Sequence, residues 1–246
     1  MKRRIGPLRV AHILPWPTVG GVEHATLRMA RYLKSVDSVA FCLDGGGQVT
    51  RLFAENGYET AEYSGVEPSF RHPGEYIRAS RSLARELRSR RIDVIHCSDL
   101  LAAYFAGLAG RLAGIPVTSH VRCQFDEISR RDRVFLRFIQ RWIFVSRSTW
   151  ETFGVKVPDH RGAVVHEAID REPYVDGTAT RKDVLEEFGL RPDARLIGMV
   201  ARVAPIKDYD TLLRAAARVV AEDPRAHFLI VGDNSGASTY RQHQAE

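Results

Sequence analysis

Short apolar runs alternate with amphipathic helical patterns along most of the chain. Short runs bounded by polar or turn-forming residues are typical of β-strands, whereas apolar residues that recur once per helical turn are typical of helices. Strands that alternate with helices form a parallel sheet with helices on both faces. The pattern therefore predicts an α/β fold with a doubly wound parallel sheet. The expected strands are residues 8–14, 38–43, 59–63, 93–97, 116–120, 142–145 and 163–165.

Helical patterns lie between these strands, and one of them ends at Gly114 shortly before Pro116, a common helix stop. After residue 165 the alternation breaks, and prolines and glycines surround a single expected helix at about 179–188. The alternation then restarts at residue 195. The expected helices of the first part are 22–34, 49–56, 74–90, 99–113 and 128–140; the second part has strands at 195–201 and 227–231 and a helix at 208–222.

These changes in pattern define the expected domains. We predict an N-terminal Rossmann-like domain over residues 1–168, a connecting segment over 169–194, and the start of a second Rossmann-like domain over 195–246. A doubly wound domain that folds alone usually needs roughly 100 residues or more. We therefore expect the second domain to be incomplete in this chain.

The composition is that of a globular protein. Of 246 residues, 44% are hydrophobic and 27% charged, which excludes a disordered chain, a collagen and a coiled coil. Three cysteines form neither a disulfide framework nor a closely spaced metal motif, as expected in a reducing compartment. No segment approaches the ~20 apolar residues that cross a bilayer. The sequence favours a soluble, cytoplasmic protein.

The formal net charge of +6 favours phosphate-bearing ligands or an anionic membrane surface. Because no basic stripe is interleaved with aromatic residues, we do not expect nucleic acid to be a partner. A basic amphipathic pattern at 128–140 and a helical series of arginines allow peripheral contact with the inner membrane face. The pattern favours the alternative, in which they are the charged outer faces of helices that cover the sheet. The arginine series is Arg78, Arg81, Arg85 and Arg88.

Gly20 and Gly21 stand between the first expected strand and the first expected helix. Glycines at a strand's carboxyl end allow a ligand to approach the backbone closely, and the free N–H groups of a helix N-terminus favour an anion. The alternative is that the pair only turns the chain. The dinucleotide fingerprint G-x-G-x-x-G is absent here.

Arg202 and Lys207 lie in a strand-to-helix loop of the second domain. Such loops line the carboxyl edge of the sheet, where open α/β folds bind ligands, and two cations there suit a diphosphate. The alternative is a pair of solvated charges.

Together, these pieces resemble the retaining family-4 glycosyltransferases of GT-B fold, in order and in spacing. The resemblance extends from about residue 8 to residue 236. The segments that carry it are Gly20-Gly21-Val22-Glu23, the Val145-Ser146 strand end, Val164-Val165-His166-Glu167-Ala168-Ile169-Asp170, and Arg202 with Lys207.

This resemblance implies an enzyme with an acceptor-binding N-terminal domain, a C-terminal domain that binds a nucleotide-diphosphate sugar, and a cleft between them. Gly20 and Gly21 would lie against the donor phosphates and the reacting sugar. Arg202 and Lys207 would clamp the leaving diphosphate in place of a metal, so no cofactor is expected. The sugar would pass to a glycan or lipid-linked acceptor by same-face attack, with a diphosphate oxygen taking the proton.

His120 ends the fifth expected strand, where the family often carries a histidine near the reacting sugar. An imidazole there can hydrogen-bond a sugar hydroxyl or shuttle a proton, so His120 is the catalytic candidate. Glu23 and His96 are candidates on the acceptor side. Each histidine could instead be satisfied at a strand end.

Two departures from the family pattern affect these expectations. Glu167 and Ala168 replace the usual Asn-Gly, so a carboxylate enters near the domain junction. The family's Glu-x7-Glu segment, which holds the donor sugar and ribose, would lie beyond Gly232, and the sequence stops at Glu246. We therefore expect this chain alone to be inactive unless a second polypeptide completes it.

Two other functions remain open from the sequence. The chain could be a non-catalytic or split-enzyme module of the same fold that binds an acceptor or a partner. A nicotinamide-dependent oxidoreductase shares the fold class but would need the missing glycine fingerprint.

Overall fold

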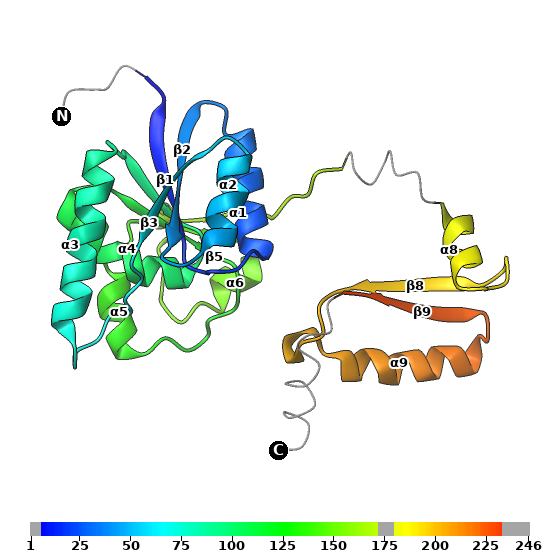
Figure 1. Cartoon of the computed structure of the whole chain (residues 1–246). Helices are drawn as coiled ribbons and strands as arrows, with labels where there is room; N and C mark the ends of the chain where they lie inside the picture. The colour runs from blue at the N-terminus through cyan, green and yellow to red at the C-terminus, as the bar shows by residue number, and fades with distance from the viewer. Residues whose placement is uncertain (1–5, 172–179, 233–246) are drawn as a thin grey trace. The chain divides into compact units, whose positions relative to one another are not determined.

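The computed structural model describes residues 6–171 and 180–232. It divides into two compact units, unit 1 over Met1–Ile169 and unit 2 over Asp170–Glu246, each with its own sheet (Figure 1). Part of the predicted connecting segment, residues 172–179, and the last part of the predicted second domain, residues 233–246, lie outside the described residues.

Unit 1 is built on a seven-stranded sheet in the order β3-β2-β1-β4-β5-β6-β7, and all neighbouring strands are parallel. The chain extends the sheet to one side from β1 to β3 and to the other side from β4 onward, so the direction switches between β1 and β4. This topology confirms the predicted fold class. The strands are β1 (Leu8–Leu14), β2 (Val36–Leu43), β3 (Glu59–Tyr63), β4 (Val94–Cys97), β5 (Val117–Val121), β6 (Arg141–Phe144) and β7 (Gly162–Val164).

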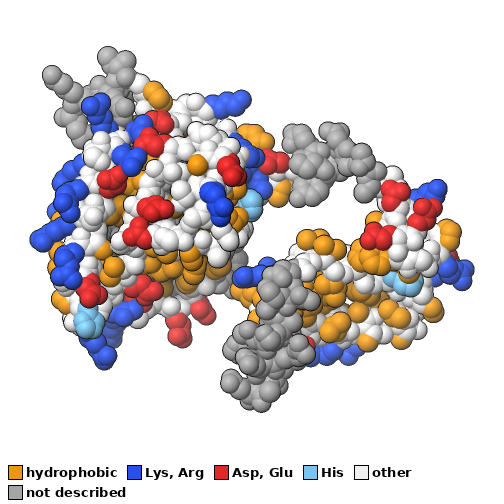
Figure 2. Space-filling model, viewed as in Figure 1, with side chains coloured by type: hydrophobic (Ala, Val, Ile, Leu, Met, Phe, Trp, Pro, Cys, Tyr) orange, Lys and Arg blue, Asp and Glu red, His pale blue; other side chains and the backbone are white. Residues whose placement is uncertain are grey.

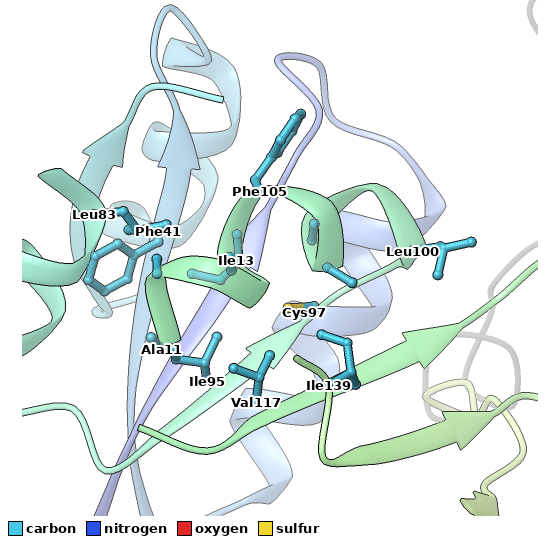
Figure 3. Packing of buried hydrophobic residues seen from close by; sticks show 14 of the residues in the cluster. Ala11, Ile13, Phe41, Leu83, Ile95, Cys97, Leu100, Phe105, Val117 and Ile139 are labelled. Atoms are coloured by element: carbon cyan, nitrogen blue, oxygen red, sulfur yellow. The ribbon is translucent and has the colours of Figure 1, made fainter. Parts of the chain in front are cut away.

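Helices cover both faces of this sheet. Alternate residues of a strand point to opposite faces, and the neighbours Ile13 and Leu14 accordingly belong to two different buried clusters. Leu14 packs with Leu27 of α1 and Phe53 of α2, whereas Ile13 packs in the larger cluster with Leu83 of α3 (Figure 3). The helices are α1 (Gly21–Tyr32), α2 (Gly47–Glu55), α3 (Pro73–Ser89), α4 (Leu100–Ala113), α5 (Arg130–Leu136) and α6 (Arg147–Glu151).

α4 packs closely on the larger-cluster face of the sheet. The Asp99 carboxylate caps its N-terminus by accepting the Ala102 N–H at 3.0 Å, and Gly114 ends it in the left-handed conformation at φ 74°. A Cβ atom added at Gly110 would lie 2.2 Å from Cγ2 of Val117 on β5. Glycine at this position therefore lets the helix approach the sheet.

Two helices differ from the sequence-based pattern. α5 spans only Arg130–Leu136 instead of 128–140, because the Ser129 hydroxyl caps its start and the chain turns after Leu136. Ile139 is nevertheless fully buried, so the apolar spacing continues past the end of the helix. The short helix Arg147–Glu151 was not predicted.

The described residues of unit 2 form two parallel strands, β8 (Arg195–Val200) and β9 (Ala226–Val231), with α8 (Arg181–Glu187) and α9 (Tyr209–Glu222). Its strands are almost continuously apolar, as is usual for parallel strands buried on both faces. Here many of these side chains are exposed, and they form much of the surface of this unit in Figure 2. The exposed apolar residues include Ile197, Val200, Leu213, Ile230 and Val231.

We expect Gly110→Ala to lower the free energy of unfolding of unit 1 by about 1–3 kcal/mol, because the new methyl group overpacks the contact with Val117. Urea unfolding followed by circular dichroism measures the change. Gly107→Ala on the same helix is the matched control, since its Cβ would first meet an atom at 3.4 Å. Both substitutions raise helix propensity equally, so equal stabilities for the two variants would contradict this account of the packing.

Candidate functional site

The predicted site residues of unit 1 lie near the carboxyl ends of β1, β4 and β5, beside the switch in strand direction. Open α/β sheets bind ligands at this place, because the loops that leave neighbouring strands diverge there. The loop after β1 leads into α1, which Gly20 caps in an extended conformation. His96 lies in β4 and His120 in β5.

Glu23 holds the glycine pair from within the first turn of α1. Its side chain is 1% exposed, and its Oε2 accepts a hydrogen bond of 2.9 Å from the Gly20 N–H. Burial raises the pKa of Glu23, and this hydrogen bond opposes the rise. Within the described residues, Oε1 is buried without a hydrogen-bond partner. Glu23 therefore fixes the backbone at the start of α1.

Packing within the described residues does not require glycine at position 21. A Cβ added at Gly21 would meet no atom within 4 Å, whereas one at Gly20 would lie 3.4 Å from Glu23 Oε2. The space beside Gly21 is thus open at the N-terminus of a helix, where backbone N–H groups favour an anion.

Three buried histidines form a row on one face of the sheet. His12, His96 and His120 all point to the face covered by α1, because their strand neighbours Ile13, Cys97 and Val121 belong to the cluster on the other face. The ring centroids of His12 and His96 are 5.2 Å apart, and those of His96 and His120 are 5.7 Å apart. His12 was not singled out from the sequence, although its alternate position in β1 would have placed it beside His96.

Burial keeps this row uncharged at neutral pH. Burial lowers the pKa of His12 to about 4 and that of His120 to about 3, and it lowers the pKa of His96 well below the ordinary value. His12 Nδ1 lies 3.1 Å from His96 Nδ1, and His12 Nε2 lies 3.1 Å from the Ser38 hydroxyl. One of the two facing Nδ1 atoms must therefore carry a proton and the other accept it.

Arg122 is a site residue that the sequence-based search missed. It follows β5 two residues after His120, so the strand alternation places both side chains on the same face. The guanidinium donates to Ser98 O at 2.7 Å and to His120 Nδ1 at 3.4 Å, and it also contacts the Glu167 carboxylate. Burial lowers the pKa of Arg122 to about 10, so it remains a cation at neutral pH.

Glu167, which replaces a usual family asparagine, also belongs to this site. Its Oε1 atom contacts Arg122 and lies 4.0 Å from His120 Nε2. The segment that carries it follows β7, and the neighbouring Ala168 carbonyl accepts a hydrogen bond of 2.8 Å from Arg28 of α1. A pocket of about 390 Å³, lined mainly by apolar residues of α1 and this segment, has His120 and Arg122 in its wall.

Arg202 and Lys207 lie in unit 2, between the end of β8 and α9. Both side chains are exposed, and Lys207 ends a short 3-10 helix of residues Pro205–Lys207. Asp208 follows with φ 47° and caps α9 by accepting the Thr211 N–H at 3.3 Å. The loop thus carries two solvent-facing cations before a helix N-terminus.

Among residues 6–171 and 180–232, no group of three or more histidine, cysteine, aspartate and glutamate side chains is arranged to hold a metal ion. The same residues include no helix of the length and apolar character needed to span a bilayer.

Residues 19–173 match the family model described as Glycosyltransferase Family 4. The UDP-Gal:alpha-D-GlcNAc-diphosphoundecaprenol alpha-1,3-galactosyltransferase of Escherichia coli is 22% identical over 95% of this chain and 64% of its own length. The D-inositol 3-phosphate glycosyltransferase of Mycobacteroides abscessus is 36% identical over 30% of this chain and 15% of its own length.

The crystal structure of Anabaena HepE in complex with UDP and glucose has the same fold. Its TM-score is 0.73 at 16% identity, over 97% of this chain and 65% of that chain. This chain therefore spans less than two thirds of the lengths of these relatives.

We expect the free energy of unfolding of unit 1 to fall as the pH drops from 6.5 toward 4, because the unfolded chain then protonates His12, His96 and His120 and the folded chain does not. For His12 alone the loss is on the order of 3 kcal/mol. Urea unfolding at several pH values measures it. His12→Gln is expected to flatten the dependence and His72→Gln, at an exposed position, to leave it unchanged; equal slopes in all three proteins would refute the assignment.

Proposed function

Because this chain belongs to Glycosyltransferase Family 4, we propose that it acts as a glycosyltransferase that moves a sugar from a nucleotide-diphosphate sugar to an acceptor hydroxyl with retention. The observation that carries this proposal is that the open helix N-terminus at Gly21 and the buried His120–Arg122 pair both follow central strands near the switch point of the sheet. The UDP-Gal named for the E. coli relative and the UDP-glucose complex of HepE support a nucleotide sugar as donor. Family membership favours an enzyme over a non-catalytic module.

Each unit, taken by itself, carries groups that favour a phosphate of the donor. In unit 1, the N–H groups at Gly20 and Gly21 and the dipole of α1 favour negative charge. In unit 2, the exposed cations Arg202 and Lys207 would neutralise the charge that develops on the leaving diphosphate. This stabilisation grows as the sugar–phosphate bond breaks, so it accelerates the reaction and does not only bind the donor.

His120 would act on a sugar hydroxyl as a neutral imidazole. Its pKa of about 3 makes it a poor general base at neutral pH, because proton transfer is efficient when the pKa lies near the working pH. We therefore assign it to hydrogen bonding, and the proton shuttle considered from the sequence is not favoured. His96 contacts His12, and its ring would pack against the His120 ring and help to keep that ring in position.

The proposed transfer needs no protein nucleophile. The acceptor oxygen forms a bond to the anomeric carbon on the face from which the diphosphate departs, and the bond between that carbon and the phosphate oxygen breaks. The acceptor proton passes to a diphosphate oxygen, which carries the electron pair of the broken bond. Charges and atoms balance, and the sugar keeps its configuration.

We also propose a lipid-linked or other phosphate-bearing acceptor and peripheral contact with an anionic membrane. The diphosphoundecaprenol in the name of the E. coli relative supports the first part. The second part is supported by α3, where Arg78, Arg81 and Arg85 are exposed and line one shallow surface. Arg88, by contrast, donates to the carbonyl groups at the end of α4 and has a structural role.

We expect Arg202→Gln and Lys207→Gln each to lower kcat/KM for the sugar nucleotide about a hundredfold, because each removes a charge that stabilises the leaving group. The assay measures sugar transfer by the protein as its source cell produces it. Lys182→Gln is the matched control, since Lys182 is an exposed lysine of the same unit and pairs only with Glu186 among the described residues. Full activity in both loop variants would reject the clamp.

Replacing Arg78, Arg81 and Arg85 together by glutamine is expected to weaken binding to anionic vesicles on the order of a hundredfold, from about 1 kcal/mol per basic residue. Co-sedimentation with phosphatidylglycerol vesicles at constant ionic strength measures the change.

The control for this test is the triple replacement of Lys182, Arg214 and Arg218 by glutamine, which changes the net charge equally at exposed positions of unit 2. If both triple variants lose the same affinity, the effect comes from net charge and α3 is not the contact surface.

A further inference from the structure

The Arg122 guanidinium fixes the tautomer of His120. A guanidinium has only donors, so the His120 Nδ1 atom that faces Arg122 Nη2 at 3.4 Å must accept and carries no proton. In the neutral ring the proton therefore resides on Nε2. His120 thus offers Nε2–H as its only ring donor.

Among the described residues, this N–H group has no hydrogen-bond partner. Nε2 of His120 is buried and unpartnered among the described residues, and the closest carboxylate oxygen, Glu167 Oε1, is 4.0 Å away. A buried donor without an acceptor is unfavourable, because it has lost its water and gained nothing in exchange. An acceptor placed between Nε2 and Arg122 would satisfy it.

The Glu167 carboxylate lies between His120 Nε2 and Arg122 but, of the two, contacts only Arg122. Its Oε1 contacts Arg122 Nη1 but remains too far from His120 Nε2 for a hydrogen bond. The Glu167 side chain is 43% exposed, whereas that of Arg122 is 9% exposed. Two contacts that do not involve the carboxylate hold the chain on either side of Glu167. Arg28 donates to the Ala168 carbonyl, and His166 Nδ1 lies 3.1 Å from the Val145 carbonyl oxygen. The carboxylate can therefore leave Arg122 by a side-chain rotation alone.

We propose that Arg122 Nη1 and His120 Nε2 form an oxyanion-binding site, in which the Glu167 carboxylate stands in for a carboxylate or phosphate group of a ligand. The pair combines one buried cation with one neutral N–H donor, and both lie in the wall of the pocket between α1 and residues 165–169. That pocket leaves room for the body of a ligand beside the anion. Charge-assisted hydrogen bonds to a planar guanidinium suit both kinds of oxyanion.

Under the proposed function, this anion is an acidic group of the donor sugar, which His120 Nε2 would bind in place of a sugar hydroxyl, or a phosphate of the acceptor. That identification rests on the proposed function, whereas the site itself does not. Its test is a binding experiment that involves no sugar transfer, so failure of either idea can be recognised separately.

The test is a titration of the full chain with inorganic phosphate and with glucuronate, at pH 7 and constant ionic strength. NMR signals of the His120 imidazole nitrogens report both the tautomer and the binding, with glucose as the neutral counterpart of glucuronate. Arg202→Gln and Lys207→Gln are introduced throughout to remove the other anion-binding candidates. We expect Glu167→Gln to bind at least one of the anions about tenfold more tightly than the protein with Glu167, because the neutral amide no longer competes for Arg122.

Glu86→Gln is the matched control, since Glu86 is 40% exposed, pairs with Arg90, and carries the same charge. A gain with phosphate alone would identify a phosphate group, and a gain with glucuronate alone would identify a sugar carboxylate. Adding Arg122→Gln to Glu167→Gln should abolish the gain, with circular dichroism used to confirm that the variant is folded. The proposal is overturned if Glu167→Gln gains no affinity for either anion, gains no more than Glu86→Gln, or shows a proton on His120 Nδ1.

Discussion

The burial of both faces of the parallel sheet is the constraint on which the site depends. With helices on each side, every second residue of the central strands must lie under α1 and α2, and the others must lie under α3 and α4. Polar residues at the carboxyl ends of β1, β4 and β5 are therefore buried with their neighbours. The same alternation that builds the two cores assembles His12, His96 and His120 into one row.

This burial also decides the chemistry that the row can perform. Buried imidazoles remain neutral at neutral pH, and the nearby Arg122 cation disfavours the protonation of His96 and His120 further. The hydrogen bonding of a neutral imidazole is still directional, because one ring nitrogen donates and the other accepts. Arg122 makes Nδ1 of His120 the acceptor and Nε2 the donor, so the main effect of the cation is to select the ring nitrogen that donates.

The sequence was sufficient for the fold because its strands are short, apolar and regularly separated by helices. Strands such as Leu8–Leu14 and Glu59–Tyr63 have the bounds that the apolar pattern predicts. The apolar pattern predicts a longer helix than α5, because buried residues such as Ile139 continue the apolar spacing where the backbone is no longer helical. Spacing records which side chains are buried, but a helix end is set by a cap such as Ser129.

The candidate site was less predictable, because its contacts join residues far apart in the sequence. Gly20, Gly21 and His120 stand at strand ends and could be found from position alone. The contact between Arg122 and Glu167 depends on how the segment after β7 returns to the end of β5, which no local pattern encodes. The sequence marks Glu167 only as a departure from the family pattern, and it does not mark its partner Arg122 at all.

The two candidate anion sites differ physically in a way that suits different tasks. Arg202 and Lys207 are exposed, so binding an anion there removes few contacts but is strongly screened by salt. Arg122 is buried and already paired, so an incoming anion must replace Glu167, yet the resulting interaction is shielded from salt and directional. Under the proposed function, exposed cations would suit a leaving group that must be released after each transfer. A buried pair with a fixed donor fits the recognition of one substituent, since affinity there depends on geometry as well as on charge.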